Sequence, residues 1–540
     1  MRILDRLLDI DGLRTLVGES QAVVAVPEAA RALVLAGTLR DAKRNHIVVA
    51  VPTTAEAERL QHDLRAFLGE DRVWGFPAWE TLPFERLSPA VETMGRRLRA
   101  AWHLKHDDGG GVIVVAPIRA LLQRLGPTSV EARPLVIRKG DVIDREKLIA
   151  DLVGLGYRRD YQVEHRGELA VRGSILDIYT STGSEPVRLE FWGDDIDRLN
   201  QFSVGDQRSG TEVDAVEIYP CREVLATPEI AVRAEALMAS EPWGREQWQR
   251  LADGESFDGM ESWLPWLTPQ VSLLTDHLGR ESQVILLDPR RLRDRASNIL
   301  AEEADLARSL AKTWDVEDDS SLPSLHVDFD RLLTNEQPQV RAWQSLADSP
   351  STPAVVISGW EPVHGDGALL VSQIQRLLAE GFVIVVAADG RGSAERLANS
   401  LKRQGIPVSL TEDPGRVIQP GIHLVVEPLE RGVLIPALKL GILSERDLTG
   451  RRRSHRVARA RRQPVAGRYE DLRVGSHVVH HQHGVARYLG MVTRPIMGSE
   501  RDYLQLEVRG GEKIYLPSDQ IELIRLYTGG DTPTLSKMGG

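Results

Sequence analysis

The residues that transfer a phosphoryl group are missing from this sequence. A P-loop uses a Gly-rich turn to wrap the phosphates, a Lys to reach the outer phosphates and a hydroxyl to bind Mg²⁺. The chain contains no Gly-Lys-Ser or Gly-Lys-Thr, and no Asp-Glu-x-Asp or Asp-Glu-x-His that would hold the metal. Without these groups the electrostatic clamp of phosphoryl transfer is lost. We therefore expect the chain to act by binding, with no catalytic residue, no metal and no cofactor of its own.

The place where a P-loop would lie can still be located. The apolar run 22–26 predicts a buried parallel strand, and ligands of such sheets bind beyond the carboxyl ends of the strands. The loop at this position reads Pro27-Glu28-Ala29-Ala30-Arg31. Glu28 would place a negative charge at the helix start, where an anion would need to bind. A lost nucleotide site is the favoured interpretation, and an unorthodox one is the alternative.

A second loop with glycines precedes a predicted helix near the middle of the chain. It reads Asp389-Gly390-Arg391-Gly392-Ser393. A lone Gly-rich loop is weak support for phosphate binding, so a tight turn capped by Ser393 is favoured over a phosphate site.

Two basic or metal-binding patterns occur further along. His477, His480, His481 and His483 could suggest zinc, but side chains along a strand alternate between faces and no Cys lies nearby, so we predict no metal site. Residues 451–462 hold seven arginines, which predict an exposed linker with possible contact to DNA phosphates. The candidates for that contact are Arg451, Arg452, Arg453, Arg456, Arg459, Arg461 and Arg462.

Composition limits the class of protein. The chain has 540 residues, of which 42% are hydrophobic and 27% charged, so several domains are expected. The net charge of -11 argues against a general nucleic-acid coat. Cys221 is the only cysteine, which excludes an internal disulfide and favours a reducing, cytoplasmic location. The N-terminus does not resemble a secretory signal, and the apolar runs are too short to cross a bilayer.

The chain alternates between α/β and all-β patterns. Short β-branched runs at 22–26, 47–51 and 112–115 predict a parallel sheet with helices at 28–39 and 54–68, and a later strand at 284–289 is followed by a long helix at 290–314. Runs at 354–358, 382–387 and 423–426 predict a second small α/β domain. Residues 160–164, 169–179 and 186–197 predict β-strands joined by turns, as do several runs after residue 474. The predicted divisions are 1–133, 134–222, 223–335, 336–445, 446–469, 470–528 and 529–540.

The β-rich segment carries a specific resemblance. Its phrases Arg-Gly-x-Ile-Leu-Asp-Ile and Pro-x-Arg-Leu-Glu-Phe-x-Gly-Asp-x-Ile-Asp, followed by Gln207-Arg208-Ser209, resemble the domain by which the excision-repair protein UvrB binds UvrA. The aromatic, proline-rich stretch 76–89 and the helix after it resemble the version in transcription-repair coupling factors. Taken alone, that stretch could stack bases, but buried loop anchors are the favoured use. The resemblance implies a UvrB-like degenerate P-loop α/β domain, completed by residues 223–335, into which a β-rich UvrA-binding domain is inserted.

The resemblance also implies which residues face UvrA. By position, they are Arg172, Arg188 and Trp192. Arginines that make bidentate contacts and a large aromatic are residue types that dominate interface energies. The alternative is that both arginines pair with Asp177, Glu190 or Asp194 on neighbouring strands.

The last domain resembles the RNA-polymerase-interacting domain shared by coupling factors and CarD-type regulators. The phrases His483-Gly484-Val485-Ala486-Arg487-Tyr488 and Ile514-Tyr515-Leu516-Pro517 carry this likeness, which implies a small all-β, Tudor- or CarD-like barrel that binds the polymerase β subunit. An exposed strand edge would suit such docking. Candidate docking residues are Tyr488, Leu489, Thr493, Arg494, Pro495 and Ile496.

Together these features predict a multidomain α/β and α+β protein that is the N-terminal adaptor half of a coupling factor. UvrA and RNA polymerase would be its partners. The parent would be an ATP-dependent DNA translocase whose missing motor domains bind ATP, Mg²⁺ and double-stranded DNA. Two alternatives stay open: a UvrB-like damage-binding helicase, which would need the missing P-loop, and a free-standing CarD-like regulator, which would explain only the last domain.

Overall fold

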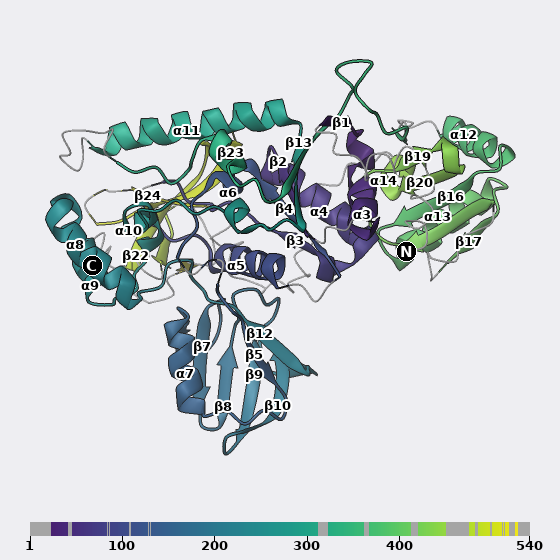
Figure 1. Ribbon diagram of the computed structural model, residues 1–540. Helices are drawn as coiled ribbons and strands as arrows, with labels where there is room; N and C mark the ends of the chain where they lie inside the picture. The colour runs from purple at the N-terminus through teal and green to yellow at the C-terminus, as the bar shows by residue number, and fades with distance from the viewer. Residues whose placement is uncertain are drawn as a thin grey trace. The chain divides into compact units, whose positions relative to one another are not determined.

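The computed structural model of the chain describes residues 23–41, 46–83, 85, 87–106, 110–127, 129, 131–311, 322–360, 367–411, 420–449, 475–480, 484–496, 499–509, 511, 513–517 and 524–526. These residues fall into two compact units. The first contains a large parallel sheet, a β-rich sheet, a helical region and a second α/β sheet (Figure 1), and the second contains the C-terminal sheet.

The large parallel sheet has the strand order β1-β14-β13-β2-β4-β3. Its strands form where β-branched runs were predicted, because continuous apolar stretches suit strands that are buried on both faces. β13 and β14 come more than 160 residues after β4, yet they pair directly with β1 and β2. The strands are β1 Val23–Ala25, β2 His46–Val51, β3 Val73–Gly75, β4 Val112–Pro117, β13 Ser282–Leu287 and β14 Gln339–Gln344.

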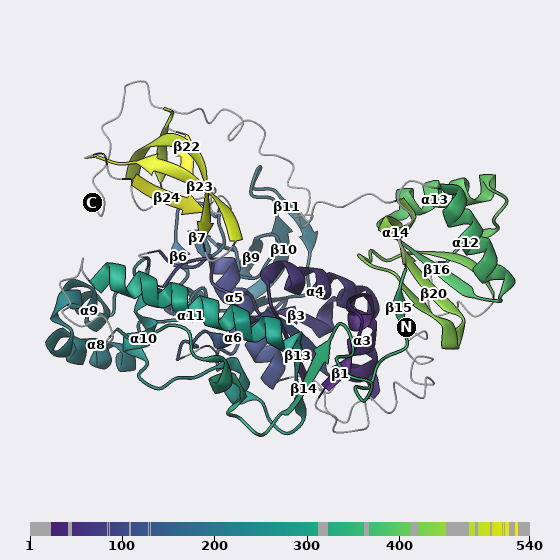
Figure 2. The same ribbon diagram turned by 90° about the horizontal axis from the view of Figure 1, so that it is seen from above.

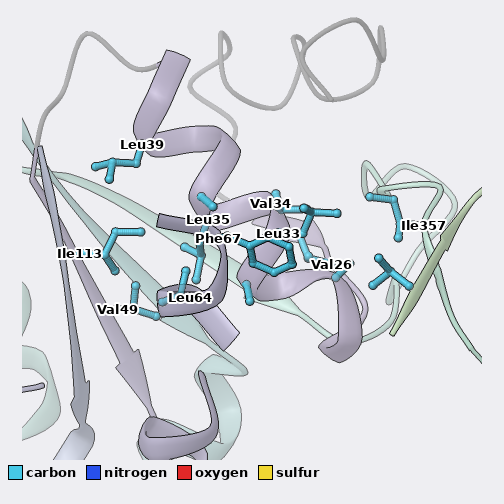
Figure 3. Close-up of a cluster of buried hydrophobic side chains, with 14 of the residues drawn as sticks. Val26, Leu33, Val34, Leu35, Leu39, Val49, Leu64, Phe67, Ile113 and Ile357 are labelled. Carbon is cyan, nitrogen blue, oxygen red and sulfur yellow. The ribbon is translucent and has the colours of Figure 1, made fainter. Parts of the chain in front are cut away.

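Helices cover both faces of this sheet. Thr53 caps α4 by accepting a hydrogen bond from the Glu56 backbone N–H at 3.3 Å. Figure 3 shows Leu33, Val34 and Leu35 of α3 meeting Leu64 and Phe67 of α4 over Val49 and Ile113 of the sheet. The helices are α3 Arg31–Asp41, α4 Thr54–Leu68, α5 Val91–Lys105, α6 Ile118–Leu122 and the long α11 Pro289–Ala311.

The stretch 76–89 contributes buried anchors. Phe76 and Trp79 are 1% and 2% exposed. The Arg97 guanidinium lies 4.1 Å from the centre of the Phe76 ring, and its Nε is 2.6 Å from an oxygen of the fully buried Glu223. Trp79 Nε1 donates to the same Glu223 oxygen at 2.7 Å. These aromatic rings are therefore packed inside the protein and are not a platform for bases.

The β-rich sheet has the order β11-β10-β9-β8-β7-β6, and α7 Arg145–Gly154 packs on one of its faces (Figure 1). The predicted strand at 160–164 is wrong: these residues form a loop, and pairing in this part of the chain is limited to β6 Arg158–Arg159. β5 Leu135–Arg138 and β12 Ala215–Ile218 form a separate antiparallel pair. The remaining strands are β7 Glu168–Arg172, β8 Ile175–Ile178, β9 Val187–Trp192, β10 Asp195–Phe202 and β11 Ser209–Glu212.

The helical region packs around tryptophans. Trp243, Trp248, Trp263 and Trp266 have ring centres within 5.2–6.3 Å of one another. Three of the four are almost fully buried, so they form a core for helices too short to be stable alone. The helices are α8 Pro228–Ser240, α9 Arg245–Ala252 and α10 Leu264–Leu267.

The second α/β sheet has the order β15-β19-β20-β16-β18-β17, with α12 and α13 beside it (Figure 2). The predicted strand at 354–358 is mostly wrong. Ala354 makes one isolated bridge to Ala25 of β1, and the regular strand is only Ser358–Gly359. The elements are β15 Ser358–Gly359, α12 Gly367–Ala379, β16 Val383–Ala388, α13 Arg391–Arg403, β17 Val408–Leu410, β18 Gly421–Val426, β19 Val433–Ile435, β20 Leu440–Ser444 and α14 Glu445–Thr449.

The C-terminal sheet is antiparallel throughout, with the order β24-β23-β22-β21-β25. Val478, Ala486, Leu504, Leu506 and Leu516 form its buried side. The strands are β21 His477–His480, β22 Gly484–Ile496, β23 Ser499–Glu507, β24 Lys513–Pro517 and β25 Ile524–Leu526.

Candidate protein-interaction site

Because its strands alternate, the β-rich sheet packs one face against α7, and its opposite, open face is covered only in part, by a small apolar cluster around Phe202. Along β9, Val187, Leu189 and Phe191 belong to the core shared with α7. Side chains of successive strand residues point to opposite faces, so Arg188 and Trp192 lie on the open face. The sequence-predicted site residues are thus placed on the side of the sheet away from α7.

The two predicted arginines meet on one carboxylate. Asp177 of β8 is fully buried, and it pairs in register with Arg188 of β9. Arg188 Nε donates to Asp177 Oδ1 at 2.7 Å, and its Nη2 donates to Oδ2 at 2.9 Å. Arg172, at the end of β7, donates to the same Oδ2 at 2.7 Å. One buried carboxylate therefore holds two guanidinium groups in place.

Arg172, Arg188 and Asp177 together carry one net positive charge, and Glu190 on the same face also interacts electrostatically with Arg188. Hydrogen bonds with Asp177 raise the pKa of the Arg188 guanidinium, which also lies 4.7 Å from the centre of the Phe202 ring. The Arg188 side chain is 12% exposed, whereas that of Arg172 is 41% exposed. The predicted alternative, pairing with a neighbouring carboxylate, is confirmed for Asp177. Arg188 Nη1 also donates to Ser209 Oγ at 3.4 Å, so the guanidinium is held from two strands.

Trp192 is a large and strongly exposed side chain on this face. It ends β9, next to a turn in which Gly193 has φ +64°, and it is 81% exposed. Water-exposed indole surface of this size is a common anchor in protein interfaces. The structure places Arg172, Arg188 and Trp192 on one face, and their role in binding stays a prediction.

One residue of this face was missed by the sequence analysis. Ile175 of β8 pairs with Arg172 on one side and with Glu190 on the other, so all three lie in one row. Strand alternation could have identified it, because Ile175 is two residues before Asp177.

The carboxyl edge of the parallel sheet is closed by ion pairs. Arg31, in the loop where a P-loop would lie, donates to Asp288 Oδ2 and to Ser345 Oγ, each at 2.9 Å. Asp288 follows β13 and Ser345 follows β14, so three strand ends contribute to one hydrogen-bonded group. Arg31 and Asp288 are only 6% and 14% exposed.

Two further ion pairs border the same edge. Glu28 lies 2.7 Å from the guanidinium of Arg431, and Glu56 lies 2.7 Å from that of Arg291. The hydrogen bond with Glu56 raises the pKa of the Arg291 guanidinium. Each arginine here is balanced by a carboxylate of the protein itself.

The loop at 389–393 is also occupied by a protein carboxylate. Glu445, at the start of α14, accepts the backbone N–H of Asp389 at 3.1 Å and the hydroxyl of Ser393. The predicted Ser393 cap is wrong, because the cap position is Gly390 and Ser393 lies within the first turn of α13. The Glu445 carboxylate thus interacts with the groups that a phosphate would use.

The predicted polymerase-binding residues lie on β22. Tyr488 belongs to the buried core of the C-terminal sheet, and Leu489 is half-buried. The backbone of Thr493, Arg494, Pro495 and Ile496 continues β22 and pairs with residues 499–502 of β23. Met491 on the same strand is 55% exposed and was missed by the sequence analysis.

The remaining predicted features fall partly outside the described residues. All seven arginines of 451–462, together with His481 and His483, lie outside them, while His477 and His480 belong to β21. Among the residues that the structure does describe, no group of three or more His, Cys, Asp or Glu is arranged to hold a metal ion. Within the same residues, every helix is too short or too polar to cross a membrane.

Comparison with known proteins supports both resemblances. The family described as "UvrB interaction domain" matches residues 135–223, and the "CarD-like/TRCF RID domain" matches residues 472–528. A transcription-repair-coupling factor of Mycobacterium tuberculosis is 34% identical over 97% of this chain and 46% of its own length. Those of Bacillus subtilis and Haemophilus influenzae are 27% and 28% identical, over 90% and 93% of this chain and 43% and 45% of their own lengths. The chain therefore spans somewhat less than half the length of these relatives.

Proposed function

We propose that this chain, which corresponds to the N-terminal portion of a transcription-repair-coupling factor, is the adaptor that recruits UvrA to a stalled RNA polymerase. The observation that carries the proposal is the open face of the β-rich sheet. It presents two arginines held by a buried carboxylate and an 81% exposed tryptophan, inside the segment that matches the UvrB interaction domain. The arginines would bind carboxylates of UvrA, and Trp192 would bury its ring against it.

The second attachment would be through the C-terminal sheet. It would form the small CarD-like barrel of the polymerase-interacting domain and bind the β subunit through β22 and its neighbours. Strand pairing along an open sheet edge would supply backbone hydrogen bonds, and side chains such as that of Met491 would add specificity.

This portion of the protein would bind no nucleotide. Supporting observations are the ion pairs of Arg31, Glu28 and Glu56, which fill the carboxyl edge of the parallel sheet with protein charges. The sheet would then be a degenerate relative of the UvrB nucleotide-binding domain, into which the β-rich domain is inserted. ATP hydrolysis with Mg²⁺ and translocation on double-stranded DNA would belong to motor domains of the full-length protein, acting in the cytoplasm. The arginines of 451–462 would add contacts with DNA phosphates.

Calorimetric titration of the chain with UvrA tests the proposal. The wild type should bind, and the double variant Arg172→Ala/Arg188→Ala should not. Because Arg188 holds the buried Asp177, the double variant needs a thermal-unfolding control. Trp192→Ala provides a second variant that leaves the arginines and Asp177 intact. An undiminished affinity in both variants, with the fold preserved, would refute the assigned surface, and lack of binding by the wild type would refute UvrA recruitment by this portion.

A further inference from the structure

The segment before α7 runs beside the start of β10, at the same end of the β-rich sheet as Trp192. The Ile143 N–H donates to the Asp194 carbonyl at 2.8 Å, and the Ile196 N–H donates to the Asp141 carbonyl at 2.9 Å. These two bonds flank an antiparallel bridge between Val142 and Asp195. Such a pair brings the two side chains close together on one face of the sheet.

Asp195 also connects this segment to the predicted site. It pairs with Trp192 across the turn between β9 and β10. Directly paired residues point to the same face, so Val142, Asp195 and Trp192 form one row across three neighbouring segments. The neighbouring Ile143 packs against the α7 core, which confirms that Val142 points to the opposite, open face.

Two of the three residues in this row, Val142 and Trp192, are apolar and exposed, and the exposed Asp195 lies between them. Val142 is 71% exposed and Trp192 is 81% exposed. Single exposed apolar residues are normal on any protein, but here two of them flank Asp195 on the same face of the sheet as the paired arginines. The two outer strands of such a row are separated by roughly 10 Å, a span that one docking surface covers easily.

We propose that Val142 is a further contact of the UvrA-binding surface, and that this end of the sheet fits a surface of UvrA that places apolar side chains against Val142 and Trp192, a hydrogen-bond donor or cation against Asp195 and a carboxylate against Arg172. The inference rests on the proposed function. Val142 and Trp192 supply the apolar surface, and Arg172, 41% exposed and anchored by Asp177, supplies the positive charge. The three residue types together match an interface core with a charged rim.

The test compares two exposed valines of the same domain. Val142→Glu should weaken UvrA binding at least tenfold, because it replaces an apolar contact by a second carboxylate beside Asp195. Val153→Glu is the matched control: Val153 is 51% exposed but lies on α7, which covers the other face, so its affinity should equal that of the wild type. Val142→Ala, which adds no charge, should weaken binding by roughly fivefold. Thermal unfolding of all three variants checks the fold.

The outcomes separate this inference from the proposed function. Equal affinities of Val142→Glu, Val142→Ala and wild type, alongside a loss in the arginine variants, would overturn the role of Val142 and leave the function standing. Equal losses in Val142→Glu and Val153→Glu would also overturn it, since binding would then depend on charge anywhere on the domain. If the arginine variants and Trp192→Ala bind like the wild type, the assigned surface fails and this inference fails with it, whereas lack of binding by the wild type would refute the proposed function.

Discussion

Two regions of this molecule hold arginine–carboxylate pairs, and they differ in what they leave exposed. At the carboxyl edge of the parallel sheet, Arg31 and Asp288 are 6% and 14% exposed and share Ser345 as a third partner. On the open face of the β-rich sheet, Asp177 is fully buried, but Arg172 is 41% exposed and Trp192 is 81% exposed. The first region faces inward and the second faces water.

The difference shows why residue type alone does not identify a binding site. At the closed edge, Arg31 and Arg291 both contact Asp288 and Arg291 also pairs with Glu56, so the two arginines are matched by two protein carboxylates that a ligand would have to displace. Two arginines that share one buried carboxylate are oriented but not neutralised. We therefore expect the closed edge to contribute mainly to stability and the open face mainly to binding.

The largest expected effect is on stability at the closed edge. Arg31→Ala should lower the free energy of unfolding by about 3 kcal/mol, because it leaves Asp288 without its main charge partner. UvrA affinity should not change. Urea unfolding followed by circular dichroism measures the free energy of unfolding, and calorimetric titration measures the UvrA affinity. Arg291→Ala is the comparison: its guanidinium also lies 3.6 Å from Asp288, but its side chain is 54% exposed, so its loss should cost less than about 1 kcal/mol. Equal losses in the two variants would mean that the edge is not closed.

The next effect is on binding at the open face. Trp192→Ala should weaken UvrA binding by about 2 kcal/mol and leave the free energy of unfolding nearly unchanged, because the ring is already in water. Tyr161, 85% exposed in the loop after β6, offers a matched exposed aromatic. Tyr161→Ala should bind like the wild type in the same titration. A drop in stability with Trp192→Ala would show that the indole supports the sheet instead.

The two arginines should separate binding from stability within one site. Alanine at either position should weaken UvrA binding by roughly 1 kcal/mol or more. Only Arg188→Ala should also destabilise the domain, because Arg188 is 12% exposed and makes two of the three hydrogen bonds to Asp177. Thermal unfolding beside calorimetry would check this. If Arg172→Ala unfolds as readily as Arg188→Ala, both arginines are structural.

The sequence predicted the parts of this molecule that depend on local patterns. β2, β4 and β13 form where β-branched runs end in turns, since burial on both faces demands such runs. Asp177 was foreseen as a partner of the arginines because all three lie on adjacent strands. The loop at 160–164 was mistaken for a strand, since an apolar–polar alternation over five residues does not ensure a pairing partner.

The parts that could not be predicted depend on residues far apart in the chain. Arg31 and Asp288 are 257 positions apart, and nothing near either residue indicates the other. Val142 reaches the candidate site through a single bridge outside any regular strand, so no periodicity marks it. Glu445 occupies the start of α13 only because parallel pairing places the ends of β16 and β20 side by side.

The smallest expected effect is a pH dependence of the free energy of unfolding that arises around Asp63. Asp63 of α4 accepts the Glu430 backbone N–H at 2.8 Å, next to Arg431 and Asp447. Burial raises the pKa of the Asp63 carboxyl to about 7 from an ordinary value of 3.8. Between these values the unfolded chain releases a proton that the folded chain keeps. Rising pH therefore favours unfolding, and the stability that Asp63 contributes below about pH 4 is lost by about pH 7.

Asp63→Asn should remove this dependence, because the amide oxygen can still accept the Glu430 N–H but has no proton to lose. Urea unfolding at about pH 5 and about pH 8 measures this. The free energy of unfolding of the variant, relative to that of the wild type, should be higher at about pH 8 than at about pH 5. The UvrA affinities of the two proteins should have the same pH dependence. Burial also raises the pKa of Asp447, but that group is present in both proteins and cancels in the comparison. Glu58 is exposed on the same helix, so the Glu58→Gln variant should have the same free energy of unfolding as the wild type at both pH values. If Asp63→Asn changed the pH dependence of UvrA binding, the two regions would be coupled and could not be treated as separate stability and binding surfaces.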